Sequence, residues 1–162
     1  MPESYPNSII VKKQKDDVRR EYTQSSQLPT DSEKAMWGSE ESMLNRFRLG
    51  LDVITWQDVE TWLDIGCGTG RFFELAEEQN LQFRQMIGVD FTVDLIAEAR
   101  GRQHTNPARF ETSDFEAMPA DIGKVDLVTV IGVLQLCGCP LDVAMKHCVD
   151  RLAPRGQIFL TT

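Results

Sequence analysis

The 162-residue sequence lacks any apolar run near the roughly 20 residues that a membrane-spanning helix needs. Its first residues, Met1 to Asn7, also lack the apolar core of a secretory signal. Positive charge is scarce: 17 Lys and Arg stand against 25 Asp and Glu, a net charge of -8. Because nucleic-acid binding draws on clustered Lys and Arg, a small molecule or another protein fits this balance better. We therefore expect a cytoplasmic protein with no membrane and no nucleic-acid partner.

Histidine is also scarce, and the two that occur, His104 and His147, stand in no motif, so the sequence offers no histidine as a general base. Cysteines of metal sites are usually spaced C-x2-4-C, whereas a single residue separates Cys137 from Cys139. His147 and Cys148 are adjacent on an expected helix and point in different directions. We expect reduced thiols and no metal site.

The chain divides by composition near residue 35. Residues 1–35 are polar and rich in turn-forming residues, which is typical of a flexible arm or of a lid; composition does not choose between the two. From Glu40 to Ile54, apolar residues recur at spacings of three and four, which predicts an amphipathic helix. We expect residues 36–162 to form one domain.

After this helix, short apolar strands alternate with helical segments. The expected strands are 61–65, 86–89, 108–111, 125–131 and 157–161; the expected helices between them are 71–79, 93–102 and 141–152, the last ended by Pro154-Arg155-Gly156. The run from Val125 to Ile131 is rich in β-branched residues and uncharged after Asp126, which is typical of a central strand buried on both faces. This alternation predicts an α/β fold with a parallel sheet and helices on both faces.

The most specific pattern is Leu63-Asp64-Ile65-Gly66-Cys67-Gly68-Thr69-Gly70, three alternating glycines between an expected strand and a helix. Glycine permits positive φ and lets backbone N–H groups approach a ligand. Strand-to-helix turns also use glycine for steric reasons alone, but three alternating glycines favour a ligand-binding loop. A dinucleotide fingerprint requires a small residue where Arg71 stands, so that interpretation is the weaker one.

The stretch from Asp64 to Gly70 resembles motif I of the class I S-adenosylmethionine-dependent methyltransferases, small-molecule type. The resemblance implies a Rossmann-like, doubly wound parallel sheet of order 3-2-1-4-5. It also implies S-adenosylmethionine as cofactor, with S-adenosylhomocysteine as its product. In that family the glycine loop passes under the methionine portion of the cofactor, which assigns cofactor binding to Asp64, Gly66, Cys67, Gly68 and Gly70.

Two later acids extend the resemblance. Asp90, beside Phe91, follows the second expected strand and in the family binds both ribose hydroxyls, as a carboxylate can. Asp114 follows the third strand. In the family the acid at this position accepts from the adenine amino group, and the backbone of the next residue, here Phe115, donates to the ring. Considered alone, Asp90 could as well be a helix cap or turn residue, and Asp114 could as well be a residue of a surface loop. The position of each acid directly after an expected strand favours the binding role. The strand ending at Ile131 resembles motif IV, whose end faces cofactor and substrate.

Three further residues have two interpretations each. Gln135 stands where related enzymes often place a polar residue facing the substrate, and it is equally a plain helix-start residue. Tyr22 and Trp37 either close over the bound cofactor, as N-terminal segments do in related methyltransferases, or simply pack against the domain.

Members of the family normally carry a seven-stranded sheet that ends in an antiparallel pair, whereas this sequence stops where the fifth strand ends. We therefore expect a C-terminally truncated domain that lacks those strands. Its edge strand Gln157–Thr161 would then be a surface for self-association. The function implied is methyl transfer to an unidentified small molecule, with no catalytic residue identified. The alternative is a non-catalytic module that binds S-adenosylmethionine or a partner.

Overall fold

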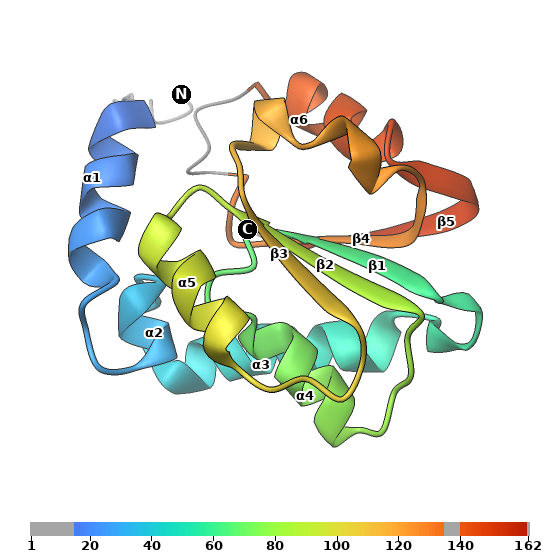
Figure 1. Cartoon of the computed structure of the whole chain (residues 1–162), viewed down its shortest axis with the longest axis horizontal. Helices are drawn as coiled ribbons and strands as arrows, with labels where there is room; N and C mark the ends of the chain where they lie inside the picture. Colours follow the sequence, from blue (N-terminus) through green and yellow to red (C-terminus); the bar gives the residue numbers. More distant parts are fainter. Residues whose placement is uncertain (1–14, 135–139, 162) are drawn as a thin grey trace, which may run out of the picture.

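The computed structural model describes residues 15–134 and 140–161. Its centre is a five-stranded sheet of order β3-β2-β1-β4-β5, and every pair of neighbouring strands is parallel. The strands are β1 Thr61–Ile65, β2 Gln85–Asp90, β3 Ala108–Thr112, β4 Val125–Ile131 and β5 Leu152–Thr161. The strand order expected from the family resemblance is therefore confirmed (Figure 1).

Helices cover both faces of the sheet (Figure 1). The α-helices of the described chain are α1 Lys15–Ser25, α2 Asp31–Lys34, α3 Glu40–Val53, α4 Arg71–Glu78, α5 Val93–Gly101 and α6 Leu141–Val149. The helices α3, α4 and α5 pack on one face, where Trp62 of β1 meets Phe72 and Phe73 of α4. On the other face, Leu63 and Ile65 pack with residues of α6. Alternate residues of one strand thus serve two cores, which explains why β1 is apolar over most of its length.

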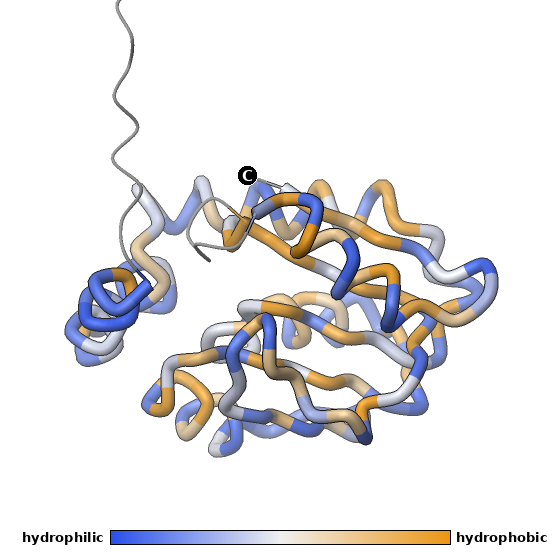
Figure 2. Tube along the Cα trace, turned by 90° about the horizontal axis from the view of Figure 1, so that it is seen from above, coloured by the Kyte–Doolittle hydropathy of each residue, from blue (hydrophilic) through white to orange (hydrophobic). Residues whose placement is uncertain are grey.

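Helix α1 lies to one side of these layers. Figure 2 shows it end-on as a mainly hydrophilic element beside the apolar interior of the sheet and its covering helices. Val18 is nevertheless buried on the side that faces the domain. Helix α2 follows and begins at a capping box, in which the Thr30 side chain and the N–H of Glu33, and the Glu33 side chain and the N–H of Thr30, are paired.

The structure corrects the expected end of the last helix. Helix α6 ends at Val149, and β5 already begins at Leu152, which pairs with Val125 of β4. The segment Pro154-Arg155-Gly156 therefore lies inside β5 and does not terminate the helix. An irregularity in the register between β4 and β5 accommodates it, with Arg155 at φ 70°. Backbone pairing with β4 thus decides the conformation of residues that sequence alone assigns to a helix end.

The carboxyl ends of the strands meet at one edge of the sheet, where the glycine turn also lies. Within residues 15–134 and 140–161, no helix combines the length and the apolar composition that crossing a bilayer requires.

Candidate functional site

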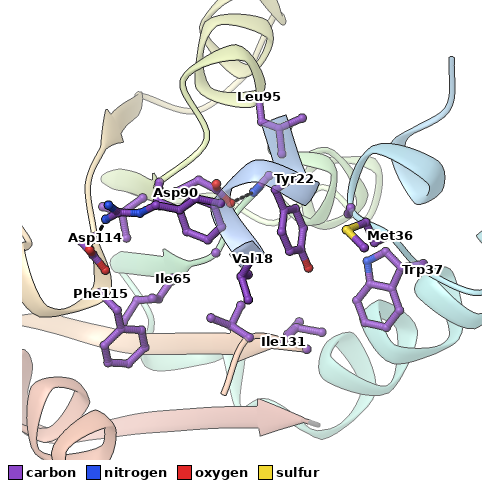
Figure 3. Close-up of a pocket in the computed structure, with 18 of the residues that line it drawn as sticks. Val18, Tyr22, Met36, Trp37, Ile65, Asp90, Leu95, Asp114, Phe115 and Ile131 are labelled. Carbon is purple, nitrogen blue, oxygen red and sulfur yellow. Dashed lines mark hydrogen bonds and ion pairs between the residues drawn. The ribbon is translucent and has the colours of Figure 1, made fainter. Parts of the chain in front are cut away.

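A cavity of about 280 Å³ lies at the carboxyl ends of the strands, where open α/β sheets bind their ligands. Residues from the ends of β1, β2 and β4 form its floor, among them Ile65, Asp90 and Ile131. Figure 3 shows Val18 and Tyr22 of α1 reaching the same space. Both the sheet and the N-terminal helix α1 therefore contribute residues to the site.

The glycine turn forms one wall of this cavity. Gly66, Gly68 and Gly70 all have positive φ, at 78°, 54° and 80°. At Gly66 a Cβ would also lie 2.2 Å from Cγ2 of Val133, so any other residue here would strain the backbone and displace Val133. Gly66 and Gly68 line the cavity, whereas Gly70 lines neither cavity described here and begins α4. At these two glycines the turn presents backbone without a side chain to the cavity.

A second cavity of about 40 Å³ adjoins the first and shares Gly66, Gly68, Trp37 and Ile131 with it. Asp64 and Cys67 line this smaller space. The Cys67 thiol is buried, and burial raises its pKa well above the ordinary value. Cys67 therefore contributes its backbone to the turn and a neutral, packed side chain to the interior.

Asp64 is a buried carboxylate on the face of β1 that α3 and α4 cover. Its side chain is held by Thr129 of β4, whose Oγ1 donates to Oδ1 at 2.5 Å. Burial raises the pKa of Asp64 to about 7; the Thr129 hydrogen bond opposes the rise, and the charge of Asp90 adds to it. Asp64 thus changes charge close to neutral pH.

Asp90 connects the glycine turn to the end of β2. Its Oδ2 accepts from the N–H of Gly68 at 3.0 Å, and its Oδ1 accepts from the N–H of Thr92 at 2.8 Å. Burial raises the pKa of Asp90, and these backbone hydrogen bonds oppose that rise. Each oxygen keeps a further lone pair, so the carboxylate remains able to accept two more hydrogen bonds from a ligand.

Asp114, the third acid, is bound to α1. Its Oδ2 accepts from Lys15 Nζ at 2.8 Å and from Nη2 of Arg19. Lys15 also contacts Glu116 at 2.7 Å. The next residue, Phe115, is buried and lines the same cavity. The structure therefore brings Asp90, Phe91, Asp114 and Phe115 together in the lining of one cavity.

Tyr22 and Trp37 both line the large cavity (Figure 3). The Tyr22 ring meets Phe91 edge-on at 5.5 Å between centroids. Burial, and after it the charge of Asp90, raises the pKa of Tyr22 to about 12, so its hydroxyl stays protonated at neutral pH. Trp37 closes on Gly132, where a Cβ would lie 2.9 Å from the indole. Gln135 lies outside the described residues.

Arg46 is a cavity residue that the sequence analysis missed. It lines the cavity from α3, one turn after Ser42, and its guanidinium stands 4.5 Å over the Trp37 ring. Among the described residues it has no acidic partner, whereas Lys15 and Arg19 are bound to Asp114. No motif marks Arg46; the four-residue spacing from Ser42 on one helical face is the only sequence signal.

In the part of the chain that the structure describes, no three His, Cys, Asp or Glu side chains converge as they would around a metal ion. Cys148 is buried, and His147 lies against the ring of Phe115 at 6.0 Å between centroids. Cys137 and Cys139 lie outside the described residues. The side chain of the other histidine, His104, is buried and paired with Glu77 at 2.9 Å, and it does not line the cavity.

Comparison with known proteins places this geometry in a family. Residues 63–156 match the family model described as "Methyltransferase domain". A carboxy-S-adenosyl-L-methionine synthase of Helicobacter pylori is 28% identical over 100 residues, which cover 60% of this chain and 41% of the relative. An uncharacterised 37.1 kDa protein in a transposon of Streptomyces fradiae is 27% identical over 111 residues, 68% of this chain and 32% of the relative.

Solved structures share the fold. Phosphoethanolamine N-methyltransferase 1 of Haemonchus contortus, in complex with phosphoethanolamine and S-adenosylhomocysteine, superposes with a TM-score of 0.71 at 21% identity. The match covers 90% of this chain and 31% of that one. The chain thus spans between about a third and two fifths of the length of the curated relatives named above.

Proposed function

The chain belongs to the methyltransferase-domain family of class I, S-adenosylmethionine-dependent proteins, and from that premise we propose that it transfers a methyl group from S-adenosylmethionine to a small-molecule acceptor. The observation that carries the proposal is one cavity at the strand ends. Gly66 and Gly68 of the glycine turn line it together with Asp90 and Asp114, and Asp64 lines the adjoining space.

The adenosine portion of the cofactor fits the end of the cavity with the two acids. Asp90 has lone pairs for two ribose hydroxyls, and its bonds to Gly68 and Thr92 fix its orientation. Asp114 offers an acceptor to an adenine amino group, beside the apolar side chains of Phe91 and Phe115. Asp90 fits the ribose because its hydrogen bonds to backbone N–H groups hold the carboxylate rigid and leave it lone pairs that can accept further hydrogen bonds.

The methionine portion carries an ammonium group and a carboxylate. Asp64 provides a buried acceptor for the ammonium beside the glycine turn. Arg46 provides the cation for the carboxylate, because it is the cavity-lining cation that has no acidic partner among the described residues. Backbone of Gly66 and Gly68 borders the space between them.

When bound, S-adenosylmethionine supplies a methyl group on a positively charged sulfur, which an acceptor nucleophile attacks in line. The residues of this chain position the acceptor and exclude water. Val18, Tyr22 and Trp37 form the apolar cover over the cavity. We propose that the N-terminal segment, to residue 35, acts as a lid over a cofactor-binding domain formed by residues 36–162.

A non-catalytic cofactor-binding module is the second candidate. The observation that favours it is the absence of histidine from the described lining of the cavity, together with a Tyr22 hydroxyl that stays protonated at neutral pH. Under this alternative the chain binds S-adenosylmethionine without transferring its methyl group.

A methyl-transfer screen separates the two candidates. The chain is incubated with S-adenosylmethionine carrying a labelled methyl group and with pools of small-molecule acids, amines, phenols and thiols. Label transferred to an acceptor, and lost in Asp90→Ala, supports the enzyme. Cofactor binding without transfer to any pool supports the module.

A further inference from the structure

A chain of buried hydrogen bonds runs from Trp62 through Thr129 to Asp64. Asp64 of β1 and Thr129 of β4 are register partners in the sheet, and Trp62 precedes Asp64 by two residues on the same face. Trp62 and Thr129 are fully buried, and Asp64 is 4% exposed. Three polar groups are thus aligned inside the core that α3 and α4 cover.

The direction of this chain is fixed by its chemistry. An indole N–H can only donate, so Thr129 Oγ1 accepts from Trp62 Nε1 at 2.8 Å. The hydroxyl has a single hydrogen, and it points to Oδ1 of Asp64 at 2.5 Å. A hydroxyl held by a donor on one side donates a stronger hydrogen bond on the other. Thr129 therefore stabilises the charged form of Asp64.

Packing of the core alone does not require these buried polar groups. An apolar strand pair would fill the same core without the cost of burying polar groups. The chain instead ends at a carboxylate that lines the smaller cavity beside the glycine turn. Oδ1 accepts from Thr129, and Oδ2 has no hydrogen-bond partner among the described residues, so Oδ2 is available to a ligand.

We propose that Thr129, held by Trp62, is a positioning residue for cofactor binding, which orients the Asp64 carboxylate and keeps it charged for the ammonium group of the cofactor. The inference rests on the proposed function, since it takes the ligand of Asp64 to be the methionine portion of S-adenosylmethionine or S-adenosylhomocysteine.

Other charged groups face the same cavity, and most are fixed by partners. Asp31 is paired with Arg102, Lys34 with Glu98, and Arg71 with Glu74 and Glu78. The Cys67 thiol is kept neutral by burial. Asp90 is the remaining group with a raised pKa near Asp64. The test must therefore change the Asp64 hydrogen bond while leaving Asp90 untouched.

Thr129→Val and Thr129→Ser are the matched pair for this test. Valine has nearly the shape of threonine and lacks the hydroxyl, whereas serine keeps the hydroxyl. The affinity for S-adenosylhomocysteine is measured by calorimetry from pH 5.5 to 8.5, with thermal unfolding as a control for folding. Carbon-13 NMR of the Asp64 carboxyl in the ligand-free chain follows its titration directly.

The sign follows from the hydrogen bond. The Thr129 hydroxyl lowers the pKa of Asp64, so loss of the hydroxyl moves the titration of Asp64 to higher pH. Below pH 7 we expect Thr129→Val to bind S-adenosylhomocysteine about tenfold more weakly than the parent, a gap that closes to within about twofold at pH 8.5. Thr129→Ser is expected to follow the parent within about twofold throughout.

A double-mutant cycle with Asp64→Asn completes the design. If Thr129 acts through Asp64, Thr129→Val adds no further loss in the Asp64→Asn chain. A loss that persists in that background, or an unchanged Asp64 titration, overturns the proposal. Should Thr129→Val not fold, Trp62→Phe removes the donor that holds the hydroxyl, and an unshifted Asp64 titration there overturns it equally. A folded parent that binds no S-adenosylhomocysteine overturns the proposed function and this inference together.

Discussion

Arg19 of α1 donates a hydrogen bond to the carboxylate of Asp114, which lies 95 residues later in the loop after β3. Lys15 binds the same oxygen from the preceding turn of the helix, at 2.8 Å. Both contacts end at the acid that the family resemblance assigns to adenine. The first turns of α1 and the part of the cavity lined by Asp114 are therefore coupled by charge.

This coupling predicts that Arg19→Ala speeds the release of S-adenosylhomocysteine several-fold. Partly exposed ion pairs contribute on the order of 0–1 kcal/mol, so the change belongs in the dissociation rate more than in folding stability. Stopped-flow displacement measures the rate, and raising the salt should speed release from the parent more than from the variant. Arg20→Ala is the control, since Arg20 pairs with Asp17 on the same helix. Equal release rates in both variants would show that the contact does not hold α1 closed.

Asp90→Ala is expected to weaken S-adenosylhomocysteine binding by roughly 1.5–3 kcal/mol, the scale for hydrogen bonds to a charged group. Asp90→Asn should show a smaller loss, because its amide oxygen still accepts. Calorimetry on chains with matched secondary structure gives both values, and thermal unfolding reports the lost bonds to Gly68 and Thr92 separately. Undiminished affinity in Asp90→Ala would remove the ribose assignment.

Arg46→Ala should weaken S-adenosylhomocysteine by about 1.5–3 kcal/mol and leave 5′-methylthioadenosine, which lacks the amino-acid portion, nearly unaffected. The reason is that Arg46 is assigned to the cofactor carboxylate alone. Competition binding with both ligands makes the comparison, and Arg48→Ala, an exposed neighbour bonded to Asn45, is the control. An equal loss for both ligands would indicate that Arg46 acts by supporting Trp37.

Gly66→Ala and Gly68→Ala should differ in thermal stability. Both place a side chain at positive φ, which costs about 1–2 kcal/mol per residue. The added Cβ at position 66 also meets Val133 at 2.2 Å, whereas nothing lies within 4 Å at position 68. Each kcal/mol lowers the melting temperature of a domain of this size by about 2–4 °C. Equal melting temperatures would show that Val133 moves aside without cost.

The outer edge of β5 predicts self-association. Among the described residues, β5 pairs with β4 on one side and has no strand on the other. Leu160 on this strand is 38% exposed. Light scattering across concentration should show dimers that Leu160→Lys weakens, since a charge on an edge strand opposes pairing. A parent that stays monomeric at high concentration, with the edge amides protected from exchange, would contradict this.

Much of the site could be predicted from sequence because its signals are local. Three glycines at alternate positions and an acid directly after a strand report backbone geometry, and the structure places Gly66, Gly68, Asp90 and Asp114 around one cavity as expected. The parallel sheet followed from the alternation of strands and helices for the same reason.

Contacts between distant segments could not be predicted in this way. The partner of Asp64 is Thr129, 65 residues away, and nothing near either residue announces the pair. Arg46 lies on a helix without a motif, and the role proposed for it depends on the absence of an acidic partner among the described residues. The prediction that the last helix extends to residue 152 was wrong for a related reason, because the pairing of Leu152 with Val125 is a long-range contact.

The central claim is that this cavity binds the cofactor of the family, and titration calorimetry of the folded chain with S-adenosylhomocysteine tests it most directly. We predict saturable binding at one site per chain, which is weaker in Asp90→Ala and raises the melting temperature of the parent. No heat and no thermal shift at millimolar ligand, with folded protein, would contradict it.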